Sequence, residues 1–277
     1  MSECKIIAIS NQKGGVGKTT TTFSLGVALA KGGKKVLLVD ADPQGDLTTY
    51  MGYYEQDNIP TTISTLIDRT INDIDANPQE AILEHKEGVH LIPSNLNLSM
   101  TEVNMFNAMS REYLMKNSLR GLQNNYDYII IDCMPSLGML TTNALAMANE
   151  VIIPVQSQYL SAKGMGNLLK TVSKVKRQLN NDLKVGGILL TLVDNRTALP
   201  KKIEQELEEN YGNIVKIYDT QIPVAIKTAE STSTGKSIFA YDKSSKVAEA
   251  YTLFAREVLK ENEQERRKNA LAKGFDR

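Results

Sequence analysis

The sequence predicts a single α/β domain with a doubly wound, mostly parallel central sheet flanked by helices. Short, uninterrupted apolar runs recur along the chain, and stretches of helical character separate them. The runs are KIIAIS, KVLLVD, YIIID, EVIIPV and VGGILLTLV, at residues 5–10, 35–40, 128–132, 150–155 and 185–193. Such runs are typical of parallel strands that are buried on both faces. Strands that alternate with helices favour one doubly wound sheet.

Helices are expected between these strands. The first covers residues 19–31, because Gly32 and Gly33 follow its last apolar positions as a stop signal. Further helices are expected at residues 97–123, 139–148, 162–179, 200–210 and 244–268. Since the end of the chain is mostly polar and charged, we expect one domain over residues 1–260 and a solvated helix end with a tail over residues 261–277.

The composition excludes several classes of protein. The 277-residue chain has 32 Lys and Arg against 32 Asp and Glu, so any binding of nucleic acid has to come from a local basic patch. Its two cysteines, Cys4 and Cys133, are far apart, which argues against a disulfide framework and fits a reducing cytoplasm. No stretch approaches the roughly 18 continuous apolar residues of a membrane span.

The loop after the first expected strand reads NQKGGVGKTTT, from Asn11 to Thr21. It fits the phosphate-binding pattern G-x-x-x-x-G-K-[ST], except that Gln12 replaces the first glycine and a second lysine, Lys13, follows it. Glycines let backbone N–H groups wrap round a phosphate chain, and the next helix points its positive end at the same anion. The predicted nucleotide-binding residues are Gly14, Gly15, Val16, Gly17, Lys18, Thr19 and Thr20.

Within this loop the pattern predicts a role for each polar side chain. Lys18 is expected to reach the β- and γ-phosphate oxygens, the Thr19 hydroxyl to hold Mg²⁺, and Thr20 to contact the α-phosphate. The alternative is a glycine-rich turn that binds nothing. It is disfavoured because the flanking strand and helix are the context that the motif requires.

Acidic residues end two other expected strands, at the edge where parallel sheets bind ligands. Asp132 ends YIIID, which is the Walker B arrangement for holding Mg²⁺ directly or through a bound water. We expect Asp40 near the metal, so the predicted metal set is Thr19, Asp40 and Asp132. Asp42 is expected to orient the attacking water. The alternative for Asp42 is a turn residue before Pro43.

The segment KGGVGKT, Lys13 to Thr19, resembles the deviant Walker A loop of the ParA/MinD superfamily of P-loop NTPases. Other segments resemble ParA/Soj-type partitioning ATPases. They are VLLVDADPQGDLT (36–48), YDYIIIDCMPSLGMLTTNAL (126–145), LLTLVDNRT (189–197) and GKSIFAYDKSSKVAEAY (235–251). The resemblance follows the family in order over nearly the whole chain, which makes it highly specific.

The resemblance implies a weak ATPase that uses ATP and Mg²⁺ and closes into a homodimer with ATP between its subunits. Lys13 then reaches the phosphates of the partner subunit, where a cation in a dehydrated, phosphate-rich interface is strongly stabilised. The implied catalytic residues are Lys13, Lys18 and Asp42. Asn195 and the backbone at Pro223 are the implied contacts to the adenine base. For Lys13 the alternative is a solvated loop charge.

Members of the family bind double-stranded DNA without sequence preference once they dimerise. Carried over, the DNA-binding positions are Arg196 and Lys227, while Val224 stands where many relatives have a further arginine. Lysine still neutralises a phosphate, without the fork of arginine. The resemblance also implies a ParB-like centromere-binding partner that stimulates hydrolysis, and a cytoplasmic, nucleoid-associated location with no membrane partner. Any one of the chain's other basic residues is more simply a solvated surface charge.

Three rival interpretations remain open. A MinD-like membrane-associated positioning ATPase needs an amphipathic C-terminal helix, for which the tail offers Leu271 and Phe275. An electron-donating reductase needs cysteines that bridge a cluster across a dimer, whereas Cys4 is expected inside the first strand and Cys133 beside Asp132. A bacterial tyrosine kinase would carry a C-terminal cluster of tyrosines, which this chain lacks.

Overall fold

The computed structural model describes residues 4–157, 162–194, 196 and 198–275, with only the backbone described at residues 162–163 and 269–275. In this part of the chain, one seven-stranded sheet has the order β3-β4-β2-β5-β1-β6-β7. All neighbouring strands are parallel except β3 and β4. The strands are β1 (Lys5–Ile9), β2 (Val36–Ala41), β3 (Leu83–Glu84), β4 (Val89–Ile92), β5 (Tyr128–Cys133), β6 (Glu150–Gln156) and β7 (Lys184–Thr191).

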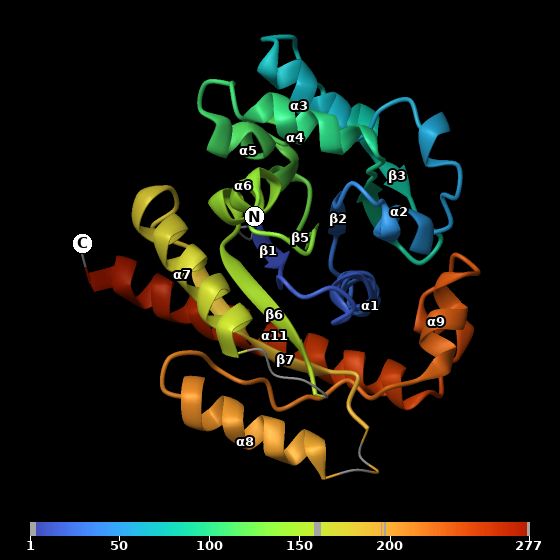
Figure 1. Ribbon diagram of the computed structural model, residues 1–277, viewed down its shortest axis with the longest axis vertical. Helices are drawn as coiled ribbons and strands as arrows, with labels where there is room; N and C mark the ends of the chain where they lie inside the picture. Colours follow the sequence, from blue (N-terminus) through green and yellow to red (C-terminus); the bar gives the residue numbers. More distant parts are fainter. Residues whose placement is uncertain (1–3, 158–161, 195, 197, 276–277) are drawn as a thin grey trace.

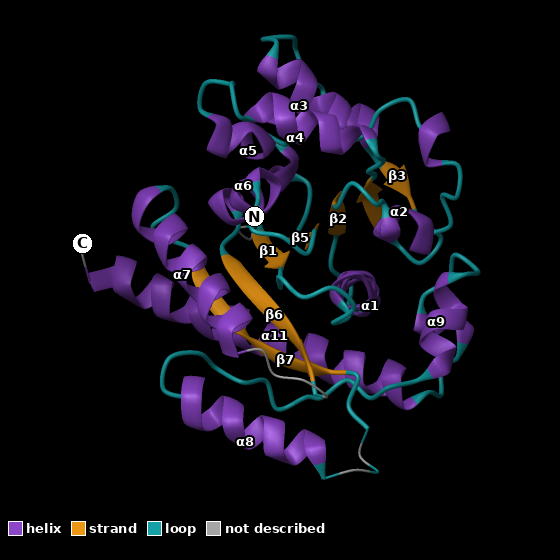
Figure 2. Cartoon of the chain, in the orientation of Figure 1, coloured by secondary structure: helices purple, strands orange, loops and turns teal. Residues whose placement is uncertain are grey.

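Helices lie on both sides of the sheet (Figure 1 and Figure 2). They are α1 (Lys18–Lys31), α2 (Asp46–Tyr50), α3 (Ile63–Ile71), α4 (Asn97–Met105), α5 (Leu114–Ser118), α6 (Met139–Met147), α7 (Ala162–Gln178), α8 (Leu199–Tyr211), α9 (Ile226–Thr232), α10 (Ile238–Tyr241) and α11 (Lys246–Phe275). One core lies between the sheet and α3 to α8, and a second lies between the sheet and α1, α2, α10 and α11. The predicted doubly wound α/β fold is confirmed.

Successive residues of a strand belong in turn to the two cores. In β5, for example, Ile129 and Ile131 belong to the first core, whereas Tyr128 and Ile130 belong to the second. Successive side chains of a strand point to opposite faces, so a strand between two helical layers has to be apolar throughout. All six residues of β5 are buried, and so are all six of β2. The uninterrupted apolar runs of the sequence therefore have a direct structural cause.

The single helix expected at residues 97–123 is wrong, because the structure divides this region into short helices. Ser110 adopts a left-handed backbone conformation with φ of 51°, which a continuous α-helix does not allow. The side chain of Asn143 on α6 accepts a hydrogen bond from Met115 N at 3.0 Å and donates one to the backbone oxygen of Arg111 at 2.8 Å. Contacts of this segment with α6 therefore stabilise short helices in place of one continuous helix.

Helix α11 crosses the lower part of the molecule in Figure 1 and continues through residue 260 without a break. Beyond that point, Asn262 donates to the hydroxyl of Tyr128 at 3.1 Å, and Glu265 pairs with Lys5 at 2.7 Å. The division between residues 1–260 and 261–277 stays a prediction. Cys4 lies one residue before β1 rather than inside it. Within the described residues, no helix has the length and apolarity needed to cross a bilayer.

The segment between α9 and α10 packs against the end of α2 and the β3–β4 turn. Gly52 and Gly235 both have positive φ, of 90° and 64°, and their backbones touch so closely that a Cβ on Gly235 would lie 2.7 Å from the Cα of Gly52. The Tyr54 hydroxyl donates to the backbone oxygen of Ser233 at 3.1 Å. A ring nitrogen of His85 lies 3.2 Å from the Gly235 oxygen. These contacts fix α9 relative to α2.

Candidate functional site

The loop between β1 and α1 has the backbone geometry that a phosphate chain requires. Gly15 and Gly17 adopt positive φ values of 70° and 82°, a region that only glycine enters without strain. A Cβ placed on Gly14 or Gly15 would meet no atom within 4 Å, so the space in front of the loop is open. Helix α1 begins at Lys18 with no side-chain cap on its first turn, which leaves its N–H groups to an anion.

Two side chains that the sequence motif does not mark hold this loop in place. Asn11 donates to the backbone oxygen of Pro154 at 2.7 Å and accepts from Lys13 N at 3.0 Å. Thr191, at the end of β7, donates to the backbone oxygen of Val16 at 2.8 Å. The loop is therefore fastened to β6 and β7 as well as to its own flanking elements. No signal in the sequence pairs these positions, because the contacts join residues far apart in the chain.

Lys18 is turned inward, with 7 % of its surface exposed. Its Nζ donates to the backbone oxygen of Lys13 at 3.2 Å, across the mouth of the loop. Burial lowers the pKa of Lys18, against the attraction of Asp132. A buried ammonium group that donates to a neutral carbonyl is better compensated by a nearby anion. The phosphate chain of a nucleotide would supply that anion.

Two buried carboxyl groups face the loop from neighbouring strands. Asp40 and Asp132 are direct register partners on β2 and β5. Burial raises the pKa of Asp40 to about 7, opposed by hydrogen bonds from Thr48 and from Asp42 N. Burial is the main cause that raises the pKa of Asp132 well above its usual value, and the charge of Asp40 raises it further. Both carboxyl groups are therefore costly to ionise without a cation beside them.

The oxygens of these carboxyl groups indicate which of them meets a metal. Asp40 Oδ2 accepts from Thr48 N at 2.9 Å and from the Thr48 hydroxyl at 2.7 Å. Asp132 Oδ1 accepts from the Thr22 hydroxyl at 3.4 Å, whereas its Oδ2 is buried without a hydrogen-bond partner in the described structure. A buried unsatisfied carboxylate oxygen fits Mg²⁺ or a water bound to it. The Thr19 side chain also lies near Asp132 and lowers the pKa of this carboxyl group, against the effect of burial.

The described residues form no group of three or more His, Cys, Asp or Glu side chains that could hold a metal by themselves. Of the predicted metal set, Asp132 and Thr19 lie together, while the hydrogen bonds of Asp40 hold α2 through Thr48. Asp40 therefore positions α2 at the site, and its role toward a metal stays a prediction.

Asp42 lies on the loop between β2 and α2, half-buried, at the same edge of the sheet. Its N–H donates to Asp40 Oδ1 at 3.2 Å, and its own carboxylate accepts from Gln44 N at 3.0 Å. Burial raises its pKa, and the charge of Lys18 lowers it. Both the turn-forming contact and a position near the phosphate lysine are present, so the two interpretations of Asp42 do not exclude each other.

Lys13 lies beside the end of β6. Its Nζ is 3.4 Å from Gln156 Oε1, within the same subunit. Gln156 is half-exposed at the strand end, so this contact can exchange for another without unfolding the sheet. The role of Lys13 toward a second subunit stays a prediction.

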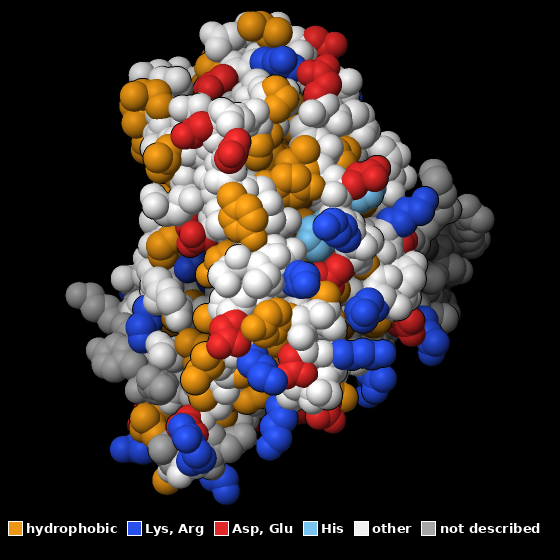
Figure 3. Space-filling model, turned by 90° about the vertical axis from the view of Figure 1, so that its right-hand side faces the viewer, with side chains coloured by type: hydrophobic (Ala, Val, Ile, Leu, Met, Phe, Trp, Pro, Cys, Tyr) orange, Lys and Arg blue, Asp and Glu red, His pale blue; other side chains and the backbone are white. Residues whose placement is uncertain are grey.

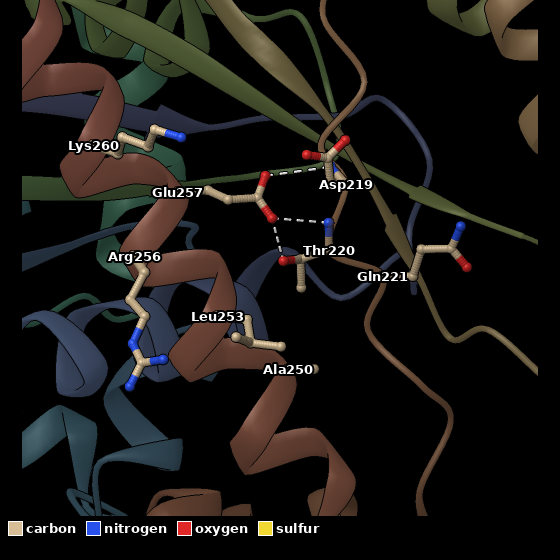
Figure 4. Close-up of a pocket in the computed structure, with 8 residues that line it drawn as sticks. All are labelled: Asp219, Thr220, Gln221, Ala250, Leu253, Arg256, Glu257 and Lys260. Atoms are coloured by element: carbon tan, nitrogen blue, oxygen red, sulfur yellow. Dashed lines mark hydrogen bonds between the residues drawn. The ribbon is translucent and has the colours of Figure 1, made fainter.

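The predicted adenine contacts are described only in part. Asn195 lies outside the described residues. Pro223 is paired with Val193 beyond the end of β7, and Val224 N donates to the Val193 oxygen at 3.0 Å. Figure 4 shows how α11 holds the preceding segment: Glu257 accepts from Asp219 N at 3.2 Å and from Thr220 N at 2.9 Å. Glu257 thereby sets the path of the backbone that leads to Pro223.

The two predicted DNA contacts are exposed, and each is paired with an acidic neighbour. Arg196 donates to both carboxylate oxygens of Asp194, at 2.8 and 2.7 Å, and Lys227 Nζ lies 2.6 Å from Asp242 Oδ2. Figure 3 shows that Lys and Arg side chains gather over the lower half of the face that carries α9, with Asp and Glu among them. Part of this surface is therefore basic, and in other parts the positive side chains are paired with acidic ones.

Comparison with known proteins finds relatives that match most of this chain. A family model described as an AAA domain matches residues 4–185. The sporulation initiation inhibitor protein Soj of Bacillus subtilis is 44 % identical over 255 residues, which cover 92 % of this chain and 98 % of Soj. The chromosome partitioning protein ParA of Myxococcus xanthus is 41 % identical, over 92 % of this chain and 88 % of ParA.

A solved structure supports the same placement. It is a Mycobacterium smegmatis protein, described as cobyrinic acid a,c-diamide synthase, with a bound ATP analogue and magnesium. It is 36 % identical to this chain with a TM-score of 0.79, over 92 % of this chain and 94 % of that one. Together with the two curated relatives, the loop geometry and the register of Asp40 with Asp132, the matches place this chain in the ParA/Soj family of P-loop ATPases within the ParA/MinD superfamily.

Proposed function

We propose that this protein is an ATP-driven DNA-partitioning switch. Its ATP-bound form is a homodimer that binds double-stranded DNA without sequence preference, and hydrolysis, stimulated by a ParB-like partner, releases it. The observation that carries the proposal is the phosphate loop with its two lysines, Lys13 and Lys18, beside the paired carboxyl groups of Asp40 and Asp132. The names of Soj and ParA support the partitioning role.

ATP and Mg²⁺ are the cofactors that the site fits. The open space before Gly14 and Gly15, the uncapped start of α1 and the buried Lys18 all suit a phosphate chain. The unsatisfied Oδ2 of Asp132 suits the metal. The similar protein of Mycobacterium smegmatis was solved with an ATP analogue and magnesium. Bound Mg²⁺ would counter the charge that develops on the phosphate oxygens during hydrolysis.

In this proposal, side chains of this chain bind the nucleotide, hold the metal and orient the attacking water. Lys18 binds phosphate oxygens at the start of α1, and Asp132 with Thr19 holds the metal side of the site. Asp42 orients the attacking water, which is mainly a positioning task. Lys13 exchanges its contact with Gln156 for a phosphate oxygen of the partner subunit's nucleotide. Without ATP two lysines facing each other repel, and with ATP they stabilise the dimer.

DNA binding follows from dimerisation. Each subunit contributes the basic surface around Arg196 and Lys227, so a dimer contacts about twice as many phosphates. The logarithm of affinity falls in proportion to the counterions released, so this doubling separates weak monomer binding from useful dimer binding at physiological salt. ATP thus controls DNA binding by linkage between two sites.

A DNA titration tests the proposal. The wild type and Arg196→Ala are titrated onto non-specific duplex DNA with ATP, with ADP and without nucleotide, at several salt concentrations. We expect retention of the wild type that requires ATP and weakens steeply with salt, and weaker retention of the variant. Equal retention of the nucleotide-free protein would refute the switch. ATP turnover is measured without any carboxylic acid substrate, because an amide-forming synthase would be inactive under that condition.

The MinD-like alternative is tested in parallel. Liposome flotation with ATP should leave the protein in the unbound fraction, since the proposal assigns it to the nucleoid in the cytoplasm. The side chains of Leu271 and Phe275, on which a membrane-binding helix would depend, lie outside the described part of the chain. Flotation that requires ATP, combined with no DNA retention, would favour the membrane-associated function.

A further inference from the structure

Helix α6, which follows the loop after Asp132, lacks a capping residue of its own. Its N-cap position is Gly138, and its first turn contains no acidic residue. The N–H groups of a first helical turn need acceptors, which an N-cap side chain usually supplies. Here the acceptor comes from another helix: Glu102 of α4 accepts from Leu140 N through Oε1 at 3.2 Å.

The carboxylate of Glu102 also rests directly against Gly138. A Cβ built on Gly138 would meet Glu102 Oε1 at less than van der Waals distance. The negative charge lies at the positive end of α6, where the helix dipole stabilises it. Glu102 is half-buried, so the contact is less screened by water than an exposed one. Glu102 therefore replaces the missing cap of α6 from outside the helix.

The first turn of α6 in turn holds the loop that follows Asp132. The Thr141 hydroxyl donates to the backbone oxygen of Ser136 at 2.7 Å, and the Ser136 hydroxyl accepts from Gly138 N at 3.3 Å. Ser136 N donates to the Met134 oxygen at 2.8 Å. Only residues 134–138 separate the end of β5 from α6. A shift of the first turn of α6 would therefore be transmitted to the backbone beside Asp132.

We propose that Glu102 is a positioning residue for ATP hydrolysis, which acts by fixing the start of α6 and, through it, the loop next to Asp132. The inference rests on the proposed ATPase function and adds a residue that the phosphate-loop and Walker B motifs do not contain. Among the described residues, the hydrogen bond of Glu102 goes to Leu140 N and not to the phosphate loop or Asp132. Its removal should therefore slow the chemical step and leave nucleotide binding by Lys18 and the glycines nearly unchanged.

The test compares steady-state ATP hydrolysis of Glu102→Ala and Glu102→Gln with that of the wild type. The control is Asn104→Ala, an exposed position on the same helix. We expect Glu102→Ala to lower kcat about tenfold with KM for ATP within about twofold, since small misplacements near reacting groups are costly. Glu102→Gln keeps an acceptor oxygen at the same reach and should retain kcat within about threefold.

Gly138→Ala gives an independent comparison, because its methyl group displaces the carboxylate without changing Glu102. It should reproduce the loss of kcat seen in Glu102→Ala. If Glu102→Ala does not fold, Glu102→Asp, which withdraws the carboxylate by one methylene, takes its place. Glu102→Ala, or Glu102→Asp in its place, with kcat equal to that of Asn104→Ala, or with a raised KM and unchanged kcat, overturns the inference. A wild type that does not hydrolyse ATP overturns the proposed function instead.

Discussion

Asp40 and Asp132 are register partners on the adjacent parallel strands β2 and β5, so two buried carboxyl groups meet at the carboxyl edge of the sheet. Each of them is almost inaccessible to water. Burying two acids side by side is unfavourable unless protons or a cation compensate them. The pair therefore links folding stability, pH and metal binding at one place.

The first prediction concerns Asp132→Asn without nucleotide or Mg²⁺. Burial raises the pKa of Asp132 in the folded protein, so as the pH rises the acid ionises first in the unfolded chain. The wild type therefore loses free energy of unfolding from about pH 4 upward, until the pH passes the folded pKa. The neutral amide of the variant carries no such penalty. In urea unfolding, the variant should match the wild type at about pH 4 and exceed its stability above about pH 7.

The same variant should lose Mg²⁺-dependent ATP turnover, because the unpaired Oδ2 is the oxygen assigned to the metal side. Thermal unfolding of the wild type with ATP should shift upward on addition of Mg²⁺, and EDTA should abolish the shift. A variant whose stability falls with pH in parallel with the wild type would contradict the assignment of the pH effect to Asp132.

A second prediction concerns Asp42→Ala. The variant should bind ATP and dimerise, yet its turnover should fall by roughly 10²-fold or more, since it loses the group that orients the attacking water. Single-turnover hydrolysis separates this step from nucleotide exchange. Gln44→Ala is a suitable control, because Gln44 uses only its backbone N–H in the contact with Asp42. Normal turnover of Asp42→Ala would remove this residue from the mechanism.

A third prediction separates the two lysines of the loop. Lys18→Ala should lose nucleotide affinity, because the buried ammonium group lies inside the phosphate loop. Lys13→Ala should retain some nucleotide binding and lose the ATP-dependent dimer. Light scattering with and without ATP measures the mass directly, and Lys31→Ala, at the far end of α1, serves as the control. A dimer that survives in Lys13→Ala would rule out the action of this lysine across the interface.

A fourth prediction uses the ion pair between Lys227 and Asp242. Asp242→Asn releases Lys227 for a phosphate, so DNA affinity should rise and its dependence on salt should steepen by about 0.9 in the log–log slope for each subunit that contacts the DNA. Arg196→Ala should reduce the slope by a similar amount. The measurement is DNA binding with ATP between low and physiological salt, with Lys116→Ala on α5 as the control. Unchanged slopes in both variants would place the DNA elsewhere.

The sequence predicts the sheet well where strands are long and buried on both faces. The strands β1, β2, β5, β6 and β7 all match expected apolar runs, with small differences at their ends. It fails for β4, because VHLI is only four residues long and one of them is a histidine. It also fails between residues 97 and 123. There, local preference favours helix, but Asn143 and the backbone of Ser110 divide the segment.

The candidate site, too, can be predicted from the sequence only in part. Residues of the phosphate loop and the strand-end aspartates are marked by local patterns, and the structure brings Lys18, Thr19, Asp40, Asp42 and Asp132 together at one edge. The residues that hold the phosphate loop and the neighbouring segments in place are not marked by local patterns. They are Asn11, Thr191, Glu102 and Glu257, which act through contacts with distant segments. A single sequence does not reveal such pairings, since nothing in the local pattern distinguishes these side chains from solvated ones.

The contact between Gly52 and Gly235 has a consequence for how this protein can change over generations. A side chain at Gly235 would push apart the segment that follows Asp42 and the segment that carries Lys227, and a side chain at Gly52 would be strained by its φ of 90°. On the proposed function, a change of DNA affinity that moves α9 would therefore also disturb the segment that follows Asp42. Random mutagenesis with screening for activity should recover glycine at both positions. The segment after α2 and the segment after α9 can therefore change in sequence only together.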